Sequence, residues 1–200
     1  LNANTTAGNN TGIGAYALLA NTTGTRMTSV GSRSGMQNTT GNYNSFVGYD
    51  AGESNTTGES NTFIGDSAGR ETTTASNNTA VGQSALLANT TGTRNTAVGA
   101  LTLDTSTTGD QNTAVGYGAM DANTTGSNNV AIGDAALASN TTASNNTAVG
   151  DDALKFNTTG HSTIAVGTGA GQAVTTGTHN VYLGLEAGYG GTTATRLTTG

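Results

Sequence analysis

The composition of this 200-residue chain excludes a conventional globular core, because 31 residues are Gly, 42 are Thr and 23 are Asn, while Trp, Cys and Pro are absent. Leu, Ile, Val and Phe together fill only 29 of the 200 positions. This share is smaller than the roughly 20% below which disorder is the default expectation. The net charge is nevertheless only −6, whereas disordered chains are usually rich in charge and Pro. A low-complexity coil and a repeat structure remain.

Several classes of function are excluded at once. Without Cys there is no disulfide, no zinc knuckle and no thiol nucleophile. No apolar run reaches the ~18 residues that would span a bilayer, so we expect no membrane insertion in this segment. The chain opens at Leu1 without a signal-peptide core, and we expect it to be part of a longer protein. The basic residues are scattered singly, which argues against a nucleic acid partner; they are Arg26, Arg33, Arg70, Arg94, Lys155 and Arg196.

A 17-residue repeat organises the chain. An aliphatic residue followed by Gly recurs at a constant step of 17, from Ile13-Gly14 to Leu183-Gly184. We number the positions of the repeat from Asn10 and obtain the consensus N-T-A-V-G-x-x-A-L-x-x-N-T-T-G-x-x. Residues 1–196 then form one continuous array, with eleven full copies over 10–196, a partial copy at 1–9 and an out-of-phase end at 197–200.

The constant period predicts an all-β fold, a parallel β-solenoid or β-roll with one coil per repeat. Insertion-free repeats can stack because each presents the same edges to its neighbours. Positions 1–5 alternate, are rich in β-branched residues and end on Gly, which is typical of a short strand closed by a turn. The odd period requires the alternation of side chains to be reset in each coil, and we expect the Gly residues at positions 5 and 15 to do so with positive φ angles.

The copies also predict which side chains share the interior. Position 3 is aromatic in three copies, at Phe46, Phe63 and Tyr182, and each of these copies has Gly at position 9. Where position 9 is Leu or Met, position 3 is Gly or Ala, so we expect the two positions to share one packed layer of conserved volume.

Position 4 is aliphatic in every copy, and adjacent strand residues point to opposite faces. Both faces are therefore apolar, and we expect a second chain to cover one of them. We assign position 4 to the structural core, through Val30, Val47, Ile64, Val81, Val98, Val115, Ile132, Val149, Val166 and Leu183.

The pentapeptide Asn-Thr-Ala-Val-Gly at 78–82, 95–99, 112–116 and 146–150 resembles the S-V-A-I-G motif in the heads of trimeric autotransporter adhesins. The longer string that continues to Asn-Thr-Thr-Gly is similar to repeats of phage tail fibres and of bacterial surface proteins with an endosialidase-type chaperone domain. The resemblance covers 1–196, although the unit is longer than the adhesin-head repeat. It implies a left-handed β-roll, a homotrimer and an extracellular location.

Candidate sites are few. The two histidines, His161 and His179, and the acidic residues at positions 6 and 7 fit surface turns better than a metal site, and no catalytic grouping recurs. We therefore assign no catalytic residue, cofactor or metal. N-x-[ST] sequons recur at position 12, and we consider glycosylation there against a turn role for Asn; these candidates are Asn4, Asn21, Asn38, Asn55, Asn89, Asn123, Asn140 and Asn157. Further sequons begin at Asn9, Asn77 and Asn145.

Thr-Thr at positions 13 and 14 of every copy invites comparison with ice-binding threonine arrays. Such an array needs two outward columns of threonines separated by one inward residue, whereas adjacent positions point to opposite faces. We expect the inward Thr to pair with its neighbours in the stack.

The sequence thus favours a non-enzymatic structural segment, the shaft or adhesive surface of an extracellular fibre such as a surface adhesin or tail fibre. We expect self-association into a homotrimer or filament, with surface glycans as further candidate partners. Two alternatives stay open: a glycan-coated secreted filament of single-file solenoids, and an ice- or carbohydrate-binding β-solenoid.

Overall fold

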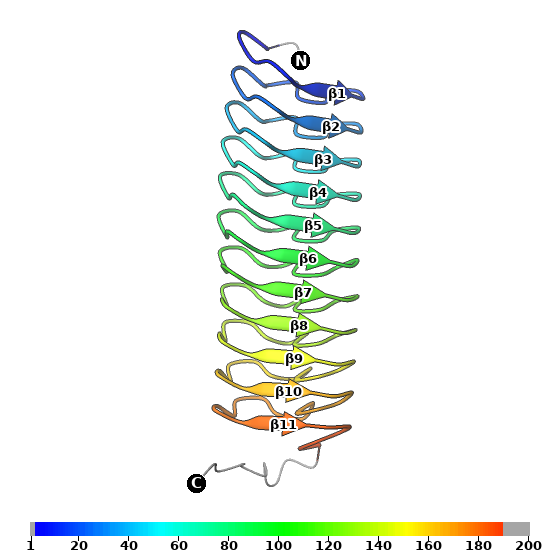
Figure 1. Cartoon of the computed structure of the whole chain (residues 1–200), viewed down its shortest axis with the longest axis vertical. Helices are drawn as coiled ribbons and strands as arrows, with labels where there is room; N and C mark the ends of the chain where they lie inside the picture. The colour runs from blue at the N-terminus through cyan, green and yellow to red at the C-terminus, as the bar shows by residue number, and fades with distance from the viewer. Residues whose placement is uncertain (1–2, 190–200) are drawn as a thin grey trace.

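The computed structural model describes residues 3–189 and shows an all-β parallel solenoid without helices in that range (Figure 1). The out-of-phase end at 197–200 lies outside the described residues. Each copy contributes one three-residue strand, at positions 2–4; the strands are β1 Thr11–Ile13, β2 Thr28–Val30, β3 Ser45–Val47, β4 Thr62–Ile64, β5 Thr79–Val81, β6 Thr96–Val98, β7 Thr113–Val115, β8 Val130–Ile132, β9 Thr147–Val149, β10 Ile164–Val166 and β11 Val181–Leu183.

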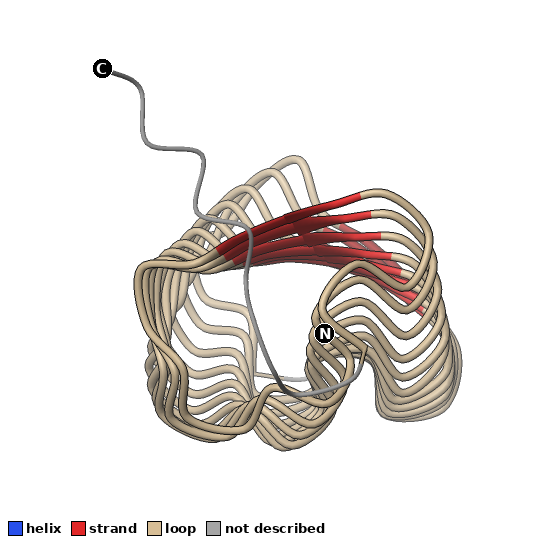
Figure 2. Cartoon of the chain, turned by 90° about the horizontal axis from the view of Figure 1, so that it is seen from below, coloured by secondary structure: helices blue, strands red, loops and turns tan. Residues whose placement is uncertain are grey.

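All eleven strands belong to one sheet in chain order. Each pairs in parallel with the next in an unshifted register, so that Phe46 pairs with Phe63 and Ala80 with Ala97. The predicted coil of 17 residues and the in-register stacking are therefore confirmed. Seen along the rod, the strands overlie one another on one side of a loop, and turns form the rest of the coil (Figure 2).

Hydrogen bonds between coils continue well beyond the short strands. The backbone N–H of Leu86 donates to the carbonyl of Thr102 at 2.9 Å, and that of Thr56 donates to Thr73 at 2.8 Å. Backbone groups in the turns are thus paired with the neighbouring coil, as buried amides and carbonyls require. The coil is held along much of its circumference although only three of its residues are strand.

Glycine at position 5 is required by the backbone. These residues have φ angles from +112° to +143°, and a Cβ on Gly48 would lie 2.2 Å from the carbonyl oxygen of Gly65 in the next coil. The expected positive φ at position 5 is therefore confirmed. Position 5 is Gly in every copy because any side chain there would collide with the backbone of the adjacent coil.

The expected positive φ at position 15 is wrong. Left-handed residues lie instead at positions 7, 9 and 17, for example Ser84, Leu86 and Arg94 with φ of 55°, 56° and 58°. Position 15 is small for a steric reason, since a Cβ on Gly58 would meet the carbonyl oxygen of Ala75 at 2.2 Å and Asn55 Oδ1 at 2.4 Å. Ala at this position in other copies, including Ala75 and Ala143, shows that this crowding can be accommodated.

The interior is lined by positions 3, 8 and 9, as the buried core residues show. A Cβ on Gly69 would lie 2.6 Å from Phe63 Cδ2, and one on Gly52 would lie 2.7 Å from Phe46 Cε1. The aromatic rings at position 3 therefore fill the space that position 9 leaves open, and the predicted volume compensation is confirmed. The two Phe rings also stack on each other with centroids 5.4 Å apart.

The assignment of position 4 to the core is wrong for the single chain. Position 3 points inward, so position 4 points outward. Ile64 is 41% exposed and Leu183 is 58% exposed, while the Val residues are half-buried or more exposed. The outcome applies to Val30, Val47, Ile64, Val81, Val98, Val115, Ile132, Val149, Val166 and Leu183, none of which belongs to the buried cluster.

Candidate functional surface

Two columns of Asn run through the interior, at positions 1 and 12. Asn55 at position 12 and Asn44 at position 1 are both 0% exposed. A buried amide is costly unless its donors and acceptor are satisfied. In most coils the amide donors and the amide oxygen are hydrogen-bonded to groups of the same coil or the neighbouring one, so the columns form part of the fold.

The two columns meet at the carbonyl of position 15. Nδ2 of Asn44 donates to the carbonyl oxygen of Gly58 at 2.7 Å, and Nδ2 of Asn55 donates to the same oxygen at 3.1 Å. Asn44 Oδ1 in turn accepts from the backbone N–H of Asn61 in the next coil at 2.9 Å. The position-1 Asn therefore ties consecutive coils together, while the position-12 Asn closes its own turn.

Position 12 also forms a ladder of side-chain amides. Nδ2 of Asn38 donates to Asn21 Oδ1 at 2.9 Å, and Nδ2 of Asn55 donates to Asn38 Oδ1 at 2.7 Å. The donor always belongs to the coil nearer the C-terminus. These bonds fit the turn role of Asn, which is the alternative to glycosylation at this position.

At position 12, apart from Asn4, the structure therefore favours the turn role of Asn over N-glycosylation. The Asn side chains are fully buried and their Nδ2 atoms, the atoms that would carry the glycan, donate hydrogen bonds inside the coil. The outcome applies to Asn21, Asn38, Asn55, Asn89, Asn123, Asn140 and Asn157. Asn4 is exposed, and so are the sequon residues at position 17, Asn9, Asn77 and Asn145.

The two Thr residues of each copy have different surroundings. At position 13, Thr56 Oγ1 donates to the carbonyl of Thr73 at 3.0 Å, and the same bond recurs up the stack. The expected pairing with stack neighbours is confirmed, with a carbonyl as the acceptor. Position 14 is exposed throughout the described coils, for example at Thr91, and it forms a single outward column.

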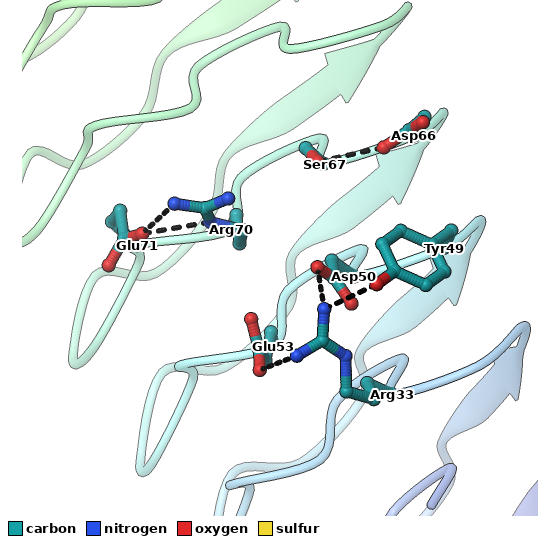
Figure 3. A network of polar contacts seen from close by, with 8 residues as sticks. All are labelled: Arg33, Tyr49, Asp50, Glu53, Asp66, Ser67, Arg70 and Glu71. Carbon is teal, nitrogen blue, oxygen red and sulfur yellow. Dashed lines mark hydrogen bonds and ion pairs between the residues drawn. The ribbon is translucent and has the colours of Figure 1, made fainter. Parts of the chain in front are cut away.

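A charged cluster lies on the turns that follow β2 to β4 (Figure 3). Arg33 approaches Asp50 at 2.5 Å and Glu53 at 3.4 Å, and it donates to the Tyr49 hydroxyl at 2.6 Å. Asp50 is only 3% exposed, so the acid at this position is paired with Arg33 and is not the solvated turn residue that we expected. These contacts link neighbouring coils, and the Arg is already engaged by its partners.

Two acidic side chains are stacked in a partly buried row at position 10. Burial raises the pKa of Asp104, and the neighbouring carboxylate of Asp121 raises it further. Burial also raises the pKa of Asp121.

The histidine rings of His161 and His179 lie 5.2 Å apart edge to face. Among residues 3–189, no group of three or more His, Cys, Asp or Glu could hold a metal ion.

The outer face of the sheet carries the aliphatic residues of position 4, whose outward direction the sequence analysis did not predict. We use this name for positions 2 and 4 of β1–β11, which flank the inward position 3 on every strand. Position 2 holds Thr11, Thr28, Ser45, Thr62, Thr79, Thr96, Thr113, Val130, Thr147, Ile164 and Val181. The repeated Thr-x-Val pattern is the sequence signal of this face.

In the described part of the chain, no helix is long and apolar enough to cross a membrane. Comparison of the chain with protein-family models, with curated proteins and with solved structures gave no match.

Proposed function

We propose that this chain is a rigid, non-enzymatic rod that serves as a spacer and repeated surface in an extracellular fibre. The observation that carries the proposal is that consecutive coils are all connected in the same way. Every strand pair from β1 to β11 has the same parallel register. Such a stack holds its two ends at a fixed distance from each other, and it gives each coil nearly the same surface. A uniform surface suits a shaft or many weak contacts better than one specific site.

The interior supports the same conclusion. The Asn columns, the Thr hydroxyls at position 13 and the aliphatic core bind each coil to the next. Buried polar groups that are hydrogen-bonded, as most of these are, favour a unique and stiff arrangement. Extracellular exposure, association into trimers and recognition of glycans are further parts of the proposal, and they depend on the resemblance of the repeats.

The Thr residues at position 14 give the glycan-coated filament a specific remaining basis. These residues are exposed on every described coil, so O-linked sugars on them would form one line along the rod. N-linked sugars at position 12 would have no comparable access. The O-linked form of this second candidate is tested by mass spectrometry of protein from the native source, with site mapping at Thr91 and Thr108.

Two measurements test the rod. Small-angle scattering from the chain should give a rod whose length grows by about 4.8 Å per coil when a second copy of the array is joined in register. Binding to purified glycans should be absent for a spacer, or should strengthen with the number of coils for a repeated adhesive surface. Tight one-to-one binding that is independent of length would overturn the proposal.

A further inference from the structure

The outer face of the sheet has the geometry of a regular array. The register places Thr79, Thr96 and Thr113 in one column, and Val81, Val98 and Val115 in a parallel column. Successive residues of a column are separated by the strand spacing of about 4.8 Å, and the two columns by two residues of strand, about 6.7 Å. Thr and Val are stiff at χ1, so their hydroxyl and methyl groups are held at fixed places.

The chemistry of this face is uniform along the rod. Positions 2 and 4 of β1–β11 contain no charged and no aromatic residue, although the chain has six basic and twelve acidic residues. The face can therefore form no ion pair with phosphate or carboxylate groups and has no aromatic ring to stack on sugars. It offers hydroxyls beside methyl groups, repeated from coil to coil.

The fold of the chain does not depend on a second copy that covers this face. The core is complete without a partner, because the buried cluster runs from Leu18 to Tyr182 within one chain. Burial of this face by another chain is therefore unnecessary for the coil to fold.

We propose that the outer face of the sheet binds ice. A ligand for this face must itself be uncharged, extended and periodic, and it must offer hydrogen-bonding groups at spacings of a few ångströms. Solid water meets each of these requirements. Thr hydroxyls bind its surface oxygens, while the Val methyls order water between them, and many weak contacts add along one rigid array. Adjacent Thr residues at positions 13 and 14 cannot form two outward columns, whereas positions 2 and 4 supply two, one mainly of Thr and one of aliphatic residues.

The test compares the full chain with two variants that gain the same charge. Thr96→Lys places a cation in the centre of the outer face, whereas Thr91→Lys places it at exposed position 14 outside that face. We expect the unmodified chain and Thr91→Lys to show thermal hysteresis and to partition into slowly growing ice. Thr96→Lys should lose most of both effects while its circular dichroism and melting temperature stay unchanged.

Three results would overturn the proposal. The first is an unmodified chain that is excluded from ice, and the second is equal loss in both variants. The third comes from light scattering on the same samples: if the unmodified chain is an oligomer that Thr96→Lys converts to a monomer, the outer face is a contact between chains. If Thr96→Lys unfolds, Thr113→Lys on the neighbouring strand takes its place, with Thr108→Lys as the control.

Discussion

Asn55 and Thr72 occupy equivalent positions in consecutive coils, and the amide oxygen of Asn55 is buried without a hydrogen-bond partner, as is the hydroxyl of Thr72. The cause is the direction of the ladder at position 12, where each Asn Oδ1 accepts from the Asn of the next coil. Thr has no amide to donate. The same defect recurs at Asn89, which precedes Ser106, and at Asn157, which precedes Val174.

Thr72→Asn should therefore stabilise the rod. The new Nδ2 would donate to Asn55 Oδ1, and the new Oδ1 would accept from Asn89. A satisfied buried hydrogen bond contributes about 1 kcal/mol, so we expect the free energy of unfolding to rise by about that amount in urea titrations. Thr74→Asn, at exposed position 14, is the matched control and should change little. A loss of stability in Thr72→Asn would contradict the directional ladder.

Gly69→Leu should destabilise the chain as long as Phe63 is present. Overpacking of a filled core costs about 1–3 kcal/mol, and Leu itself tolerates this backbone, since Leu86 has the same left-handed φ of 56°. The double variant Phe63→Ala, Gly69→Leu reproduces the pair Ala80 and Leu86 and should recover much of the loss. Additive effects in a double-mutant cycle would show that the two positions do not compete for volume.

Expression in a glycosylating host should modify Asn77 and Asn145 but leave Asn89 and Asn123 free. The first two side chains are exposed at position 17, and the other two are sealed inside the coil. Glycopeptide mapping by mass spectrometry measures this directly. Occupied Asn89 in a chain that still melts cooperatively would mean that the position-12 side chain points outward.

Replacement of Asp104 by Asn should raise stability at neutral pH. The folded pKa of Asp104 is raised above its unfolded value by burial and by Asp121, so the charged form is disfavoured in the folded state. This unfavourable contribution is present above the folded pKa and disappears as the pH falls through it towards the ordinary Asp value of about 3.9. The advantage of Asp104→Asn in thermal melts should therefore shrink on acidification.

The same titration with Asp110→Asn serves as the control, because Asp110 lies at position 16 and accepts hydrogen bonds from Thr93. Its replacement removes a charged acceptor and should not stabilise the chain at neutral pH. A pH-independent difference between the unmodified chain and Asp104→Asn would contradict the role of the raised pKa.

The sequence predicted the coil length, the parallel register and the pairing of positions 3 and 9, because each of these is a comparison between copies. It did not predict which side chains of the second half of the coil face the interior. Residues such as Ser84, Leu86 and Arg94 adopt left-handed backbone angles although nothing in these residue types favours them. Each such residue turns the chain and breaks the simple alternation from strand to turn, so the inward direction of Asn at position 12 could not be counted from position 4.

The outward direction of position 4 was not predicted for a related reason. An aliphatic residue in every copy is ordinarily a sign of the core, and Val98 was assigned there. In a coil this narrow, the small Ala97 and the residue at position 9 already fill the interior on that side, and no volume is left for position 4. Composition alone gives no measure of that limit.

The edges of each coil match those of every other coil, and this has an evolutionary consequence. Since each coil offers its neighbours the same hydrogen-bonding groups in the same register, whole repeats can be gained or lost by recombination between copies without a new junction having to be fitted. Asn10–Arg26 and Asn78–Arg94 agree at 13 of 17 residues across a separation of four coils, as expected if a block of coils was once duplicated. A gene of this design can change the reach of its product in steps of one coil.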